Sequence, residues 1–233
     1  MVEPQIFHFA TFENIINAFF KFKYPELLVF DLDKNLVGFL KARDVIKKFF
    51  KYKDILGFSA NFFLSKETEF FFNIDGNYLT FFDVMDNYKK YNVSINQFLV
   101  KDVIKFSLDE QLKKVLRKIM KVNVPIVFLE NEKPFVSLLP EELFVLAIIN
   151  IKKLFEKREI GKEEREIKIR EIAKKEKIDS VKELIKFNNV ISRNYTLSKC
   201  ISLMLGKKVL TCVTEEGYVL DIRNVYKKLE SES

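Results

Sequence analysis

One hydrophobic pattern recurs along this chain of 233 residues, and it restricts the possible folds more than any other feature. In its clearest copy, Val103 to Phe106 is predicted to be a strand, and a helix follows. One face of that helix is apolar because hydrophobic residues recur at helical spacing: Leu112, Val115, Leu116, Ile119 and Met120. Two short strands come next, at residues 124–129 and 135–139, and Pro140 starts a second helix. The predicted order is therefore strand, helix, strand, strand, helix.

The same stripe returns near both ends of the chain. Two further sets of residues have the spacing of the first helix: Phe12, Ile15, Ile16, Phe19 and Phe20, and then Leu197, Cys200, Ile201, Met204 and Leu205. A fainter copy is indicated by a hairpin turn at Asp75-Gly76 between aromatic residues, which follows a weakly periodic helix expected at Asp54 to Leu64. Because repeated patterns indicate modular architectures, we predict an α/β fold of tandem repeats. We predict three or four repeats, at residues 1–52, 94–151 and 181–230, with residues 53–93 as the possible degenerate fourth.

The stretch before the last repeat, residues 152–180, differs in composition from the rest of the chain. It is rich in Glu, Lys and Arg, and pairs such as Glu164 with Lys168 have the i, i+4 spacing that stabilises an exposed helix. We interpret this stretch as a charged helical linker that separates two parts of the molecule.

The overall charge does not identify a partner. A net charge of +7 and a pI near 9.1 favour nucleic acid, but 33 acidic residues are mixed with the 40 basic ones. A basic nucleic-acid-binding protein is therefore kept only as an alternative. The longest strongly apolar run, Leu143 to Ile151, is shorter than the roughly 20 residues that span a bilayer, so we expect a cytoplasmic protein without membrane contact. Cys200 and Cys212 are expected to be buried thiols.

The acidic segment Asp31-Leu32-Asp33 suggests a catalytic alternative. It resembles the first motif of haloacid-dehalogenase-like phosphatases, in which one aspartate attacks phosphorus and the second acts as acid and base. Strand alternation would point both carboxylates to the same side. Lys34 and Asn35 replace the usual glycine and threonine of that motif, however, and no Asp-Asp pair offers the later magnesium ligands. A polar turn between two strands remains the other interpretation of Asp31 and Asp33.

Other catalytic and metal-binding patterns are missing from the sequence. One histidine, His8, and two isolated cysteines have no zinc-site spacing, and the six glycines form no nucleotide-binding loop. We therefore predict a protein without catalytic residues and without a bound metal ion.

The repeat unit itself resembles the cystathionine-beta-synthase (CBS) domain, a small strand-helix-strand-strand-helix module that works in pairs. Residues 28–46 carry the resemblance best, because a Val-Phe-Asp strand is followed by a turn, an apolar strand with Gly38, and an Arg-Asp pair at the next helix. The pattern is repeated at Val190 to Leu197 and at Gly217 to Val225. The resemblance implies CBS-like modules paired into one or two Bateman-type units, and it covers most of the chain apart from the predicted linker.

The resemblance also implies a ligand site. CBS pairs often bind adenosine-containing molecules through a Gly-x-x-Thr-x-x-Asp segment, whose threonine meets phosphate and whose aspartate grips the ribose hydroxyls. Gly38, Lys41 and Asp44 occupy those places in the first repeat, and Lys41 could meet phosphate as an ammonium group. The backbone near Ala10, Thr11 and Leu28 would contact the base. The full set of ligand-binding residues that the resemblance implies is Asp44, Lys41, Gly38, Thr11, Leu28 and Asp86.

The expected ligand is AMP, ADP, ATP or S-adenosylmethionine. Asp44 has a second interpretation, as the N-cap of the following helix, a position that aspartate fills well. In the last two repeats the matching residues depart from the motif, so the site is expected to be vestigial there. These residues are Ser137, Pro140 and Leu143 in one repeat and Tyr218, Asp221 and Asn224 in the other.

Taken with the missing catalytic patterns, the resemblance predicts a non-catalytic regulatory or scaffolding protein that senses an adenine nucleotide in a cleft between repeats. It also implies a homodimer formed through CBS pairs and a protein partner whose identity the sequence leaves open. The apolar helix at Leu143 to Ile151 is a candidate for the dimer contact.

Overall fold

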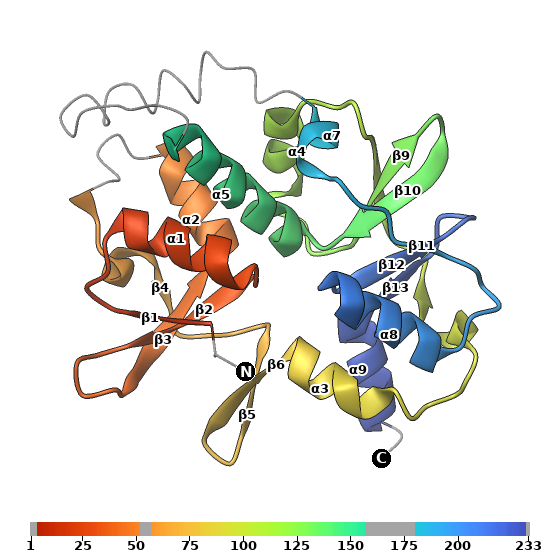
Figure 1. Ribbon diagram of the computed structural model, residues 1–233, viewed down its shortest axis with the longest axis horizontal. Helices are drawn as coiled ribbons and strands as arrows, with labels where there is room; N and C mark the ends of the chain where they lie inside the picture. The colour runs from red at the N-terminus through yellow and green to blue at the C-terminus, as the bar shows by residue number, and fades with distance from the viewer. Residues whose placement is uncertain (1–3, 52–56, 157–179, 232–233) are drawn as a thin grey trace. The chain divides into compact units, whose positions relative to one another are not determined.

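The computed structural model describes residues 4–51, 57–156 and 180–231, with side chains up to residue 152 in the second of these ranges (Figure 1). The chain divides into two compact units. Unit 1 comprises Met1–Glu69 and Glu141–Asp179, and unit 2 comprises Phe70–Pro140 and Ser180–Ser233. Each unit is thus assembled from two segments that are far apart in the sequence.

Unit 1 begins with the predicted order of strand, helix, strand, strand and helix. These elements are β1 (Gln5–Phe7), α1 (Phe12–Phe22), β2 (Glu26–Phe30), β3 (Leu36–Lys41) and α2 (Ala42–Lys51). A 3-10 helix, η2 (Ala60–Phe63), and a short strand, β4 (Leu64–Ser65), follow, and α5 (Pro140–Glu156) completes the unit from a distant part of the chain. The strands form one sheet in the order β1-β2-β3-β4, in which β1 is parallel to β2 and the other pairs are antiparallel. Helices α1, α2 and α5 lie together beside this sheet (Figure 1).

The core of unit 1 forms where the predicted apolar stripe of α1 meets its neighbours. Phe12, Ile15, Ile16 and Phe19 are all buried, at 3% exposure or less. The ring of Phe12 stacks on that of Phe49 from α2, with 5.9 Å between the ring centroids. Burial of apolar side chains is the main stabilising term for such a core, so the stripe that predicted the helix also fixes which face packs inward.

Unit 2 contains two small sheets and a separate hairpin. The sheets have the strand orders β10-β9-β8 and β11-β12-β13-β7, and the hairpin pairs β5 with β6. Its elements are, in chain order, β5 (Phe71–Ile74), β6 (Asn77–Thr80), α3 (Phe81–Tyr88), η3 (Ile95–Phe98), β7 (Leu99–Val100), β8 (Ile104–Ser107), α4 (Leu112–Ile119), β9 (Ile126–Glu130), β10 (Lys133–Leu138), α7 (Val181–Leu184), β11 (Val190–Ile191), α8 (Leu197–Lys207), β12 (Thr211–Thr214), β13 (Val219–Asp221) and α9 (Ile222–Ser231).

The mixed α/β fold and several local predictions are confirmed. Pro140 is the first residue of α5, and the Asp75-Gly76 turn joins β5 to β6 with positive φ at both residues. Cys200 and Cys212 are buried thiols, and burial raises the pKa of Cys200 to about 12. The described part of the chain contains no helix that combines the length and apolar character needed to cross a membrane.

Three regions differ from expectation or lie outside the described residues. Between residues 57 and 70, the described residues form a 3-10 helix and a short strand rather than a full α-helix before the hairpin. The predicted linker overlaps α5 up to Glu156, whereas residues 157–179 lie outside the described residues. The apolar run Leu143 to Ile151 is largely buried within the chain, so the suggestion that it forms a dimer contact loses its basis.

A buried asparagine joins the two sheets of unit 2. Asn189 is 2% exposed, and its side-chain amide donates to the carbonyl oxygens of Ser137 and Thr211 at 2.8 Å each. Its Oδ1 accepts from the backbone N–H of Ser137, also at 2.8 Å. Ser137 lies on β10 and Thr211 on β12. Because buried backbone groups need partners, this side chain fixes how the two sheets meet.

A second recurring element, which the periodicity did not reveal, is a serine that precedes a short helical turn. Ser59, Ser94 and Ser180 each precede a short helical turn, and each forms an isolated β-bridge to the residue before a longer helix. The bridges join Thr11 to Ser59, Thr196 to Ser94, and Gln111 to Ser180. A shared sequence pattern, Ser followed by a small or β-branched residue and then an apolar residue three positions later, could have found these segments.

Candidate functional site

Most of the predicted ligand-binding residues lie in unit 1, around the junction of β3 with α2. Gly38 and Lys41 are on β3, and Asp44 is in the first turn of α2. Leu28 lies opposite Phe39 in the neighbouring strand β2. The remaining residue, Asp86, belongs to α3 of unit 2, where its carboxylate pairs with the ammonium group of Lys89 at 2.7 Å.

Asp44 has a carboxylate that the described residues leave unpaired. It is half-buried and forms no hydrogen bond or ion pair with any described residue. The structure places it third in α2, which begins at Ala42, so the interpretation of Asp44 as the N-cap is wrong. A carboxylate in the first helical turn is favoured by the helix dipole. Its neighbour Arg43 differs in having an internal partner, the buried carboxylate of Glu141 on α5.

Lys41 is already engaged by two carboxylates. Its Nζ lies 3.1 Å from Oε1 of Glu69 and 3.8 Å from Oε1 of Glu26. The Lys41 side chain is 17% exposed, whereas that of Glu69 is 47% exposed. Glu69 is therefore the more accessible of the two acidic partners, because Glu26 is almost completely buried.

The carboxylate of Glu26 accepts its hydrogen bonds from the chain rather than from solvent. The hydroxyl of Thr68 and the backbone N–H of Glu69 both donate to its carboxylate, the latter at 3.2 Å. Burial raises the pKa of Glu26, and the hydrogen bond from Thr68 and the charge of Lys41 act in the opposite direction. This cluster fastens residues 68–69, the end of the first segment of unit 1, to strands β2 and β3.

Gly38 has a structural reason to be glycine. Its φ is 157°, and a Cβ atom there would lie 2.6 Å from the backbone oxygen of Ser65 on β4. The residue also borders an irregularity in the pairing of β2 with β3. The position therefore allows β4 to approach β3 closely, whether or not a ligand binds nearby.

Thr11 and Leu28, the predicted base-contacting residues, have different surroundings. Thr11 is exposed and is the N-cap of α1, where its hydroxyl accepts from the backbone N–H of Asn14 at 3.4 Å. Leu28 is completely buried, and its N–H donates to the carbonyl of Pro4 at 2.8 Å. The carbonyl of Ala10 accepts from the N–H of Ala60 at 2.8 Å, so this backbone atom already has a hydrogen-bond donor.

The aspartates of the phosphatase alternative lie in a tight turn. The backbone N–H of Asn35 donates to Oδ1 of Asp31 at 2.8 Å, and its side-chain amide donates to Oδ2 at 3.2 Å. The backbone hydrogen bond from Asn35 lowers the pKa of Asp31. Lys34 within this turn has a φ of 63°. Asp31 thus stabilises its own turn, as in the non-catalytic interpretation, and the described residues contain no cluster of three His, Cys, Asp or Glu side chains that could hold a metal ion.

Residues at the matching positions of unit 2 have internal partners. The backbone N–H and carbonyl of Ser137 bond to Asn189, whereas its buried hydroxyl has no hydrogen-bond partner among the described residues. Asp221 pairs with Arg223 at 2.8 Å, and the side-chain amide of Asn224 donates to the carbonyl of Phe98 at 2.9 Å. These groups contribute to the packing of unit 2, which gives each of them a role that needs no ligand.

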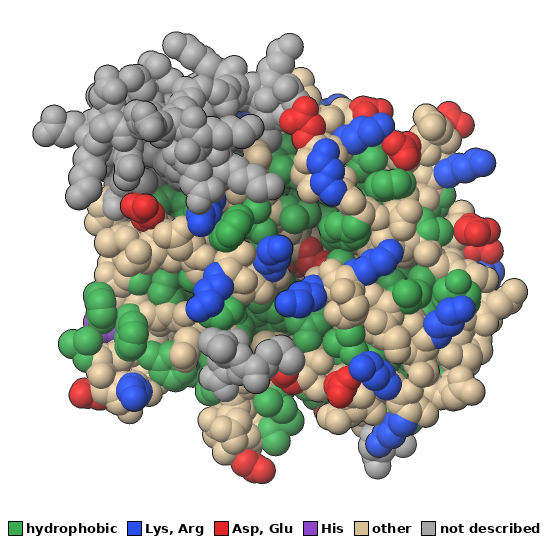
Figure 2. All heavy atoms as spheres, in the orientation of Figure 1, with side chains coloured by type: hydrophobic (Ala, Val, Ile, Leu, Met, Phe, Trp, Pro, Cys, Tyr) green, Lys and Arg blue, Asp and Glu red, His purple; other side chains and the backbone are tan. Residues whose placement is uncertain are grey.

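The surface charges do not favour the nucleic-acid alternative. On the face shown in Figure 2, lysines and arginines are interspersed with acidic and apolar side chains rather than gathered in one basic stripe. Phosphate-backbone binding depends on clustered positive charge, so the mixed surface gives this alternative no support on that face.

Comparison with known proteins gives a fold. No protein-family model matches the chain, and no curated protein matches it. The solved structure of a protein from Methanocaldococcus jannaschii, proposed to be an archaeal homologue of g-AMPK, is similar with a TM-score of 0.71. The sequences are 14% identical, and the match covers 98% of this chain and 96% of that one.

Two looser matches have TM-scores below 0.5. An uncharacterised conserved protein from Pyrococcus horikoshii has a TM-score of 0.46 at 13% identity, and the match covers 88% of this chain and 91% of that one. A CBS-domain-containing protein from Agrobacterium tumefaciens has a TM-score of 0.28 at 10% identity, over 61% of this chain and 81% of that one. The element order and the full-length match to the first structure agree with the predicted family resemblance. The chain has the fold of tandem CBS-domain proteins.

Proposed function

We propose that this protein is a non-catalytic regulatory module that binds an adenosine-containing ligand at the β3–α2 junction of unit 1. The observation that carries the proposal is the half-buried carboxylate of Asp44, which has no partner among the described residues. A carboxylate that reaches solvent and that the chain leaves unpaired has two oxygens available to accept hydrogen bonds from a ligand. The tandem CBS fold supports the same assignment.

The proposed roles follow from the chemistry of the two charged side chains. Asp44 would accept hydrogen bonds from the two ribose hydroxyls, because a carboxylate offers two acceptor oxygens. Lys41 would contact the phosphate or another anionic group as a point charge. Since Lys41 already contacts Glu69, a bound phosphate would compete with the Glu69 carboxylate for the same ammonium group.

Titration with AMP, ADP, ATP and S-adenosylmethionine tests the proposal. At a ligand concentration about 100 times Kd, binding stabilises the folded state by about 2.7 kcal/mol, which raises Tm by about 5 °C or more. Asp44→Ala is expected to weaken the tightest ligand at least about tenfold, because charged hydrogen bonds are lost.

Asp33→Ala is the matched control, because Asp33 is an exposed aspartate of the same unit and lies in the Asp31–Asn35 turn. It should leave the affinity unchanged. If none of the four compounds changes Tm or gives a calorimetric signal, or if Asp44→Ala binds as tightly as the unchanged protein, the proposal is wrong.

Glu69→Gln tests the competition at Lys41 separately. Removing the competing carboxylate is expected to tighten binding of a phosphate-containing ligand by up to about fivefold, since exposed ion pairs contribute at most about 1 kcal/mol. Isothermal titration calorimetry at moderate ionic strength would measure the change. Glu67→Gln is the matched control, because Glu67 is exposed and its side chain lies outside the Lys41 cluster. Equal affinities for the two variants would show that Glu69 does not compete with the ligand.

The predicted homodimer is a separate proposal. It rests on the pairing habit of CBS modules, and sedimentation of the purified protein would measure it directly.

A further inference from the structure

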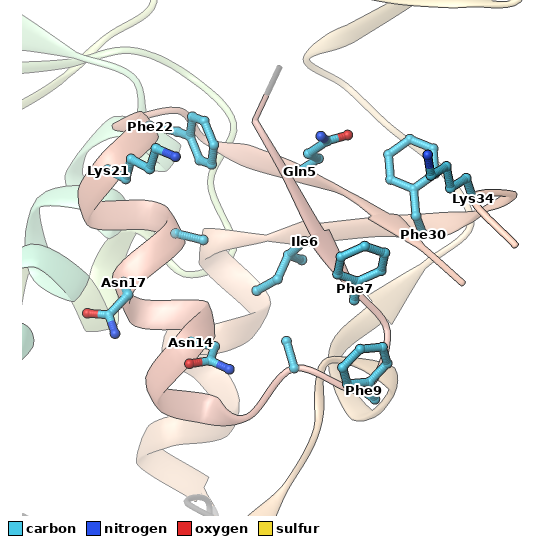
Figure 3. A pocket seen from close by; sticks show the side chains of 12 residues that line it. Gln5, Ile6, Phe7, Phe9, Asn14, Asn17, Lys21, Phe22, Phe30 and Lys34 are labelled. Carbon is cyan, nitrogen blue, oxygen red and sulfur yellow. The ribbon is translucent and has the colours of Figure 1, made fainter. Parts of the chain in front are cut away.

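A groove runs between α1 and β1 of unit 1, and of the residues expected at the nucleotide site it includes Ala10 but neither of the charged side chains. Its volume is about 620 Å³. Figure 3 shows α1 on one side and β1 on the other, with Phe30 and Lys34 beyond the strand. None of Gly38, Lys41 and Asp44 lines this groove.

The helix contributes one regular face to the groove. Asn14, Asn17, Ala18 and Lys21 line it, and they follow one another at i, i+3, i+4 and i+7 on α1. The buried stripe of α1 lies on a different face of the helix, so these four residues belong to the surface that the core does not use. Because the side chain of Ala18 is short, the surface of the helix is recessed there, between longer polar side chains.

The strand contributes a free edge. β1 is the first strand in the order β1-β2-β3-β4, so one of its sides has no neighbouring strand among the described residues. The N–H of Leu28 donates to Pro4, and the N–H of His8 donates to Phe30, which marks the side of β1 that faces β2. Backbone groups alternate along a strand, so those of Gln5 and Phe7 point to the open side.

Apart from the carbonyl of Phe7, which accepts from the N–H of Ala10, the open side has unused hydrogen-bonding groups. These are the N–H and carbonyl of Gln5 and the N–H of Phe7, for which the described residues provide no partner. An edge of this kind is a template for another strand.

The side chains around this edge are aromatic and positively charged. Phe7 and Phe9 are 46% and 54% exposed, and their rings stack with 5.5 Å between centroids. Lys21 and Lys34 bring positive charge to the groove, and no acidic residue lines it. An exposed apolar surface with one sign of charge at its rim is typical of an interaction site rather than of a solvated face.

We propose that this groove binds an acidic, extended segment of a partner protein, which adds as a strand to the free edge of β1. Backbone hydrogen bonds to Gln5 and Phe7 would supply affinity, apolar side chains on alternate positions would contact Phe7 and Phe9, and acidic side chains would pair with Lys21 and Lys34. A second copy of this chain fits less well, because a symmetric contact would bring the lysines of both copies together without an acidic residue from either groove.

A pair of labelled peptides tests the proposal on the full chain. The first alternates valine with glutamate, and the second has lysine in place of every glutamate. By fluorescence anisotropy, the acidic peptide is expected to bind at least about tenfold tighter than the basic one, a difference of about 1.4 kcal/mol. The double variant Lys21→Glu, Lys34→Glu should remove this preference. Lys47→Glu, an exposed lysine of α2 outside the groove, is the matched control and should keep it.

Amide hydrogen exchange distinguishes strand addition from simple charge attraction. On binding of the acidic peptide, exchange at the N–H groups of Gln5 and Phe7 should slow by at least about tenfold, because both would become hydrogen-bonded. Absence of binding, equal binding of the two peptides, or unchanged exchange at these two amides would overturn the proposal.

The alternative occupant is tested on the protein alone. If the protein self-associates in sedimentation experiments and the double variant Phe7→Ser, Phe9→Ser abolishes that association, then the groove binds a second copy and the proposal is wrong.

Discussion

Replacing Asn189 by alanine is expected to destabilise unit 2 by about 3 kcal/mol. The substitution removes three buried hydrogen bonds and leaves the N–H of Ser137 and the carbonyl of Thr211 without their side-chain partner. An unsatisfied buried polar group costs about 1–3 kcal/mol, and two such groups remain here. The carbonyl of Ser137 still accepts a hydrogen bond from the hydroxyl of Thr211 at 2.8 Å, so it is not a third unsatisfied group.

Urea unfolding followed by circular dichroism would measure the change in the free energy of unfolding. Asn188→Ala is the matched control, because Asn188 is the exposed neighbour, and the bond that it makes to Lys207 uses its backbone carbonyl. This variant should unfold within about 0.5 kcal/mol of the unchanged protein. An equally small effect for Asn189→Ala would mean that the two sheets of unit 2 do not depend on this side chain.

Replacing Gly38 by alanine is expected to destabilise unit 1 by about 2–4 kcal/mol. The new Cβ would lie 2.6 Å from the backbone oxygen of Ser65, so β4 must move away from β3, and the φ of 157° is unfavourable for alanine. The pairs Phe39 with Ser65 and Leu40 with Leu64 would be disturbed together. The same urea experiment measures the loss.

Gly206→Ala provides the control for the effect of losing a glycine. Gly206 lies in α8, and a Cβ atom there would meet nothing within 4 Å. Because alanine favours a helix more than glycine does, this variant should be neutral or up to about 1 kcal/mol more stable. A stability of Gly38→Ala similar to that of Gly206→Ala would show that β4 can move without cost.

Gly38→Ala also helps to separate a structural role of Gly38 from a role in ligand binding. If Gly38→Ala lowers the nucleotide affinity no more than its loss of folding stability explains, then the glycine is needed for the close approach of β4 and not for contact with a ligand. The sequence motif alone gave no way to distinguish the two roles, since both require the same residue.

Local regularities of the sequence predicted much of the fold. The spacing of Phe12, Ile15, Ile16 and Phe19 identified α1 and its buried face, because an amphipathic helix repeats its apolar residues with its own period. The Asp75-Gly76 turn was predictable for the same reason, as the required backbone conformation restricts the residues that can occupy it. These features depend on neighbours a few positions away in the chain.

The polar contacts that shape the candidate site were not predictable in this way. Lys41 meets Glu69 across 28 positions of sequence, and Asn189 meets Ser137 across 52. A lysine or an asparagine has no periodic signature, and its partner is set by tertiary packing. The prediction therefore assigned Lys41 to the ligand motif by its position, but it could not show that a carboxylate of the same chain already contacts this lysine.

The division into repeats at residues 1–52, 53–93, 94–151 and 181–230 stays a prediction. The two compact units cut across it, since α5 and the hairpin β5-β6 each belong to a different unit from the elements that precede them in the chain.

The short strand β7 makes the folding of unit 2 depend on residues that lie far along the chain. β7, at residues 99–100, has β13, at residues 219–220, as its partner, and the bridges of Ser94 to Thr196 and of Ser180 to Gln111 exchange leading segments between the two halves of unit 2. A chain that leaves the ribosome from its N-terminus must therefore hold Leu99 and Val100 without their partner strand until residues 219–220 have been made. Such distant pairings slow folding and expose strand edges in the meantime, so the synthesis of β13 decides when β7 becomes protected from aggregation.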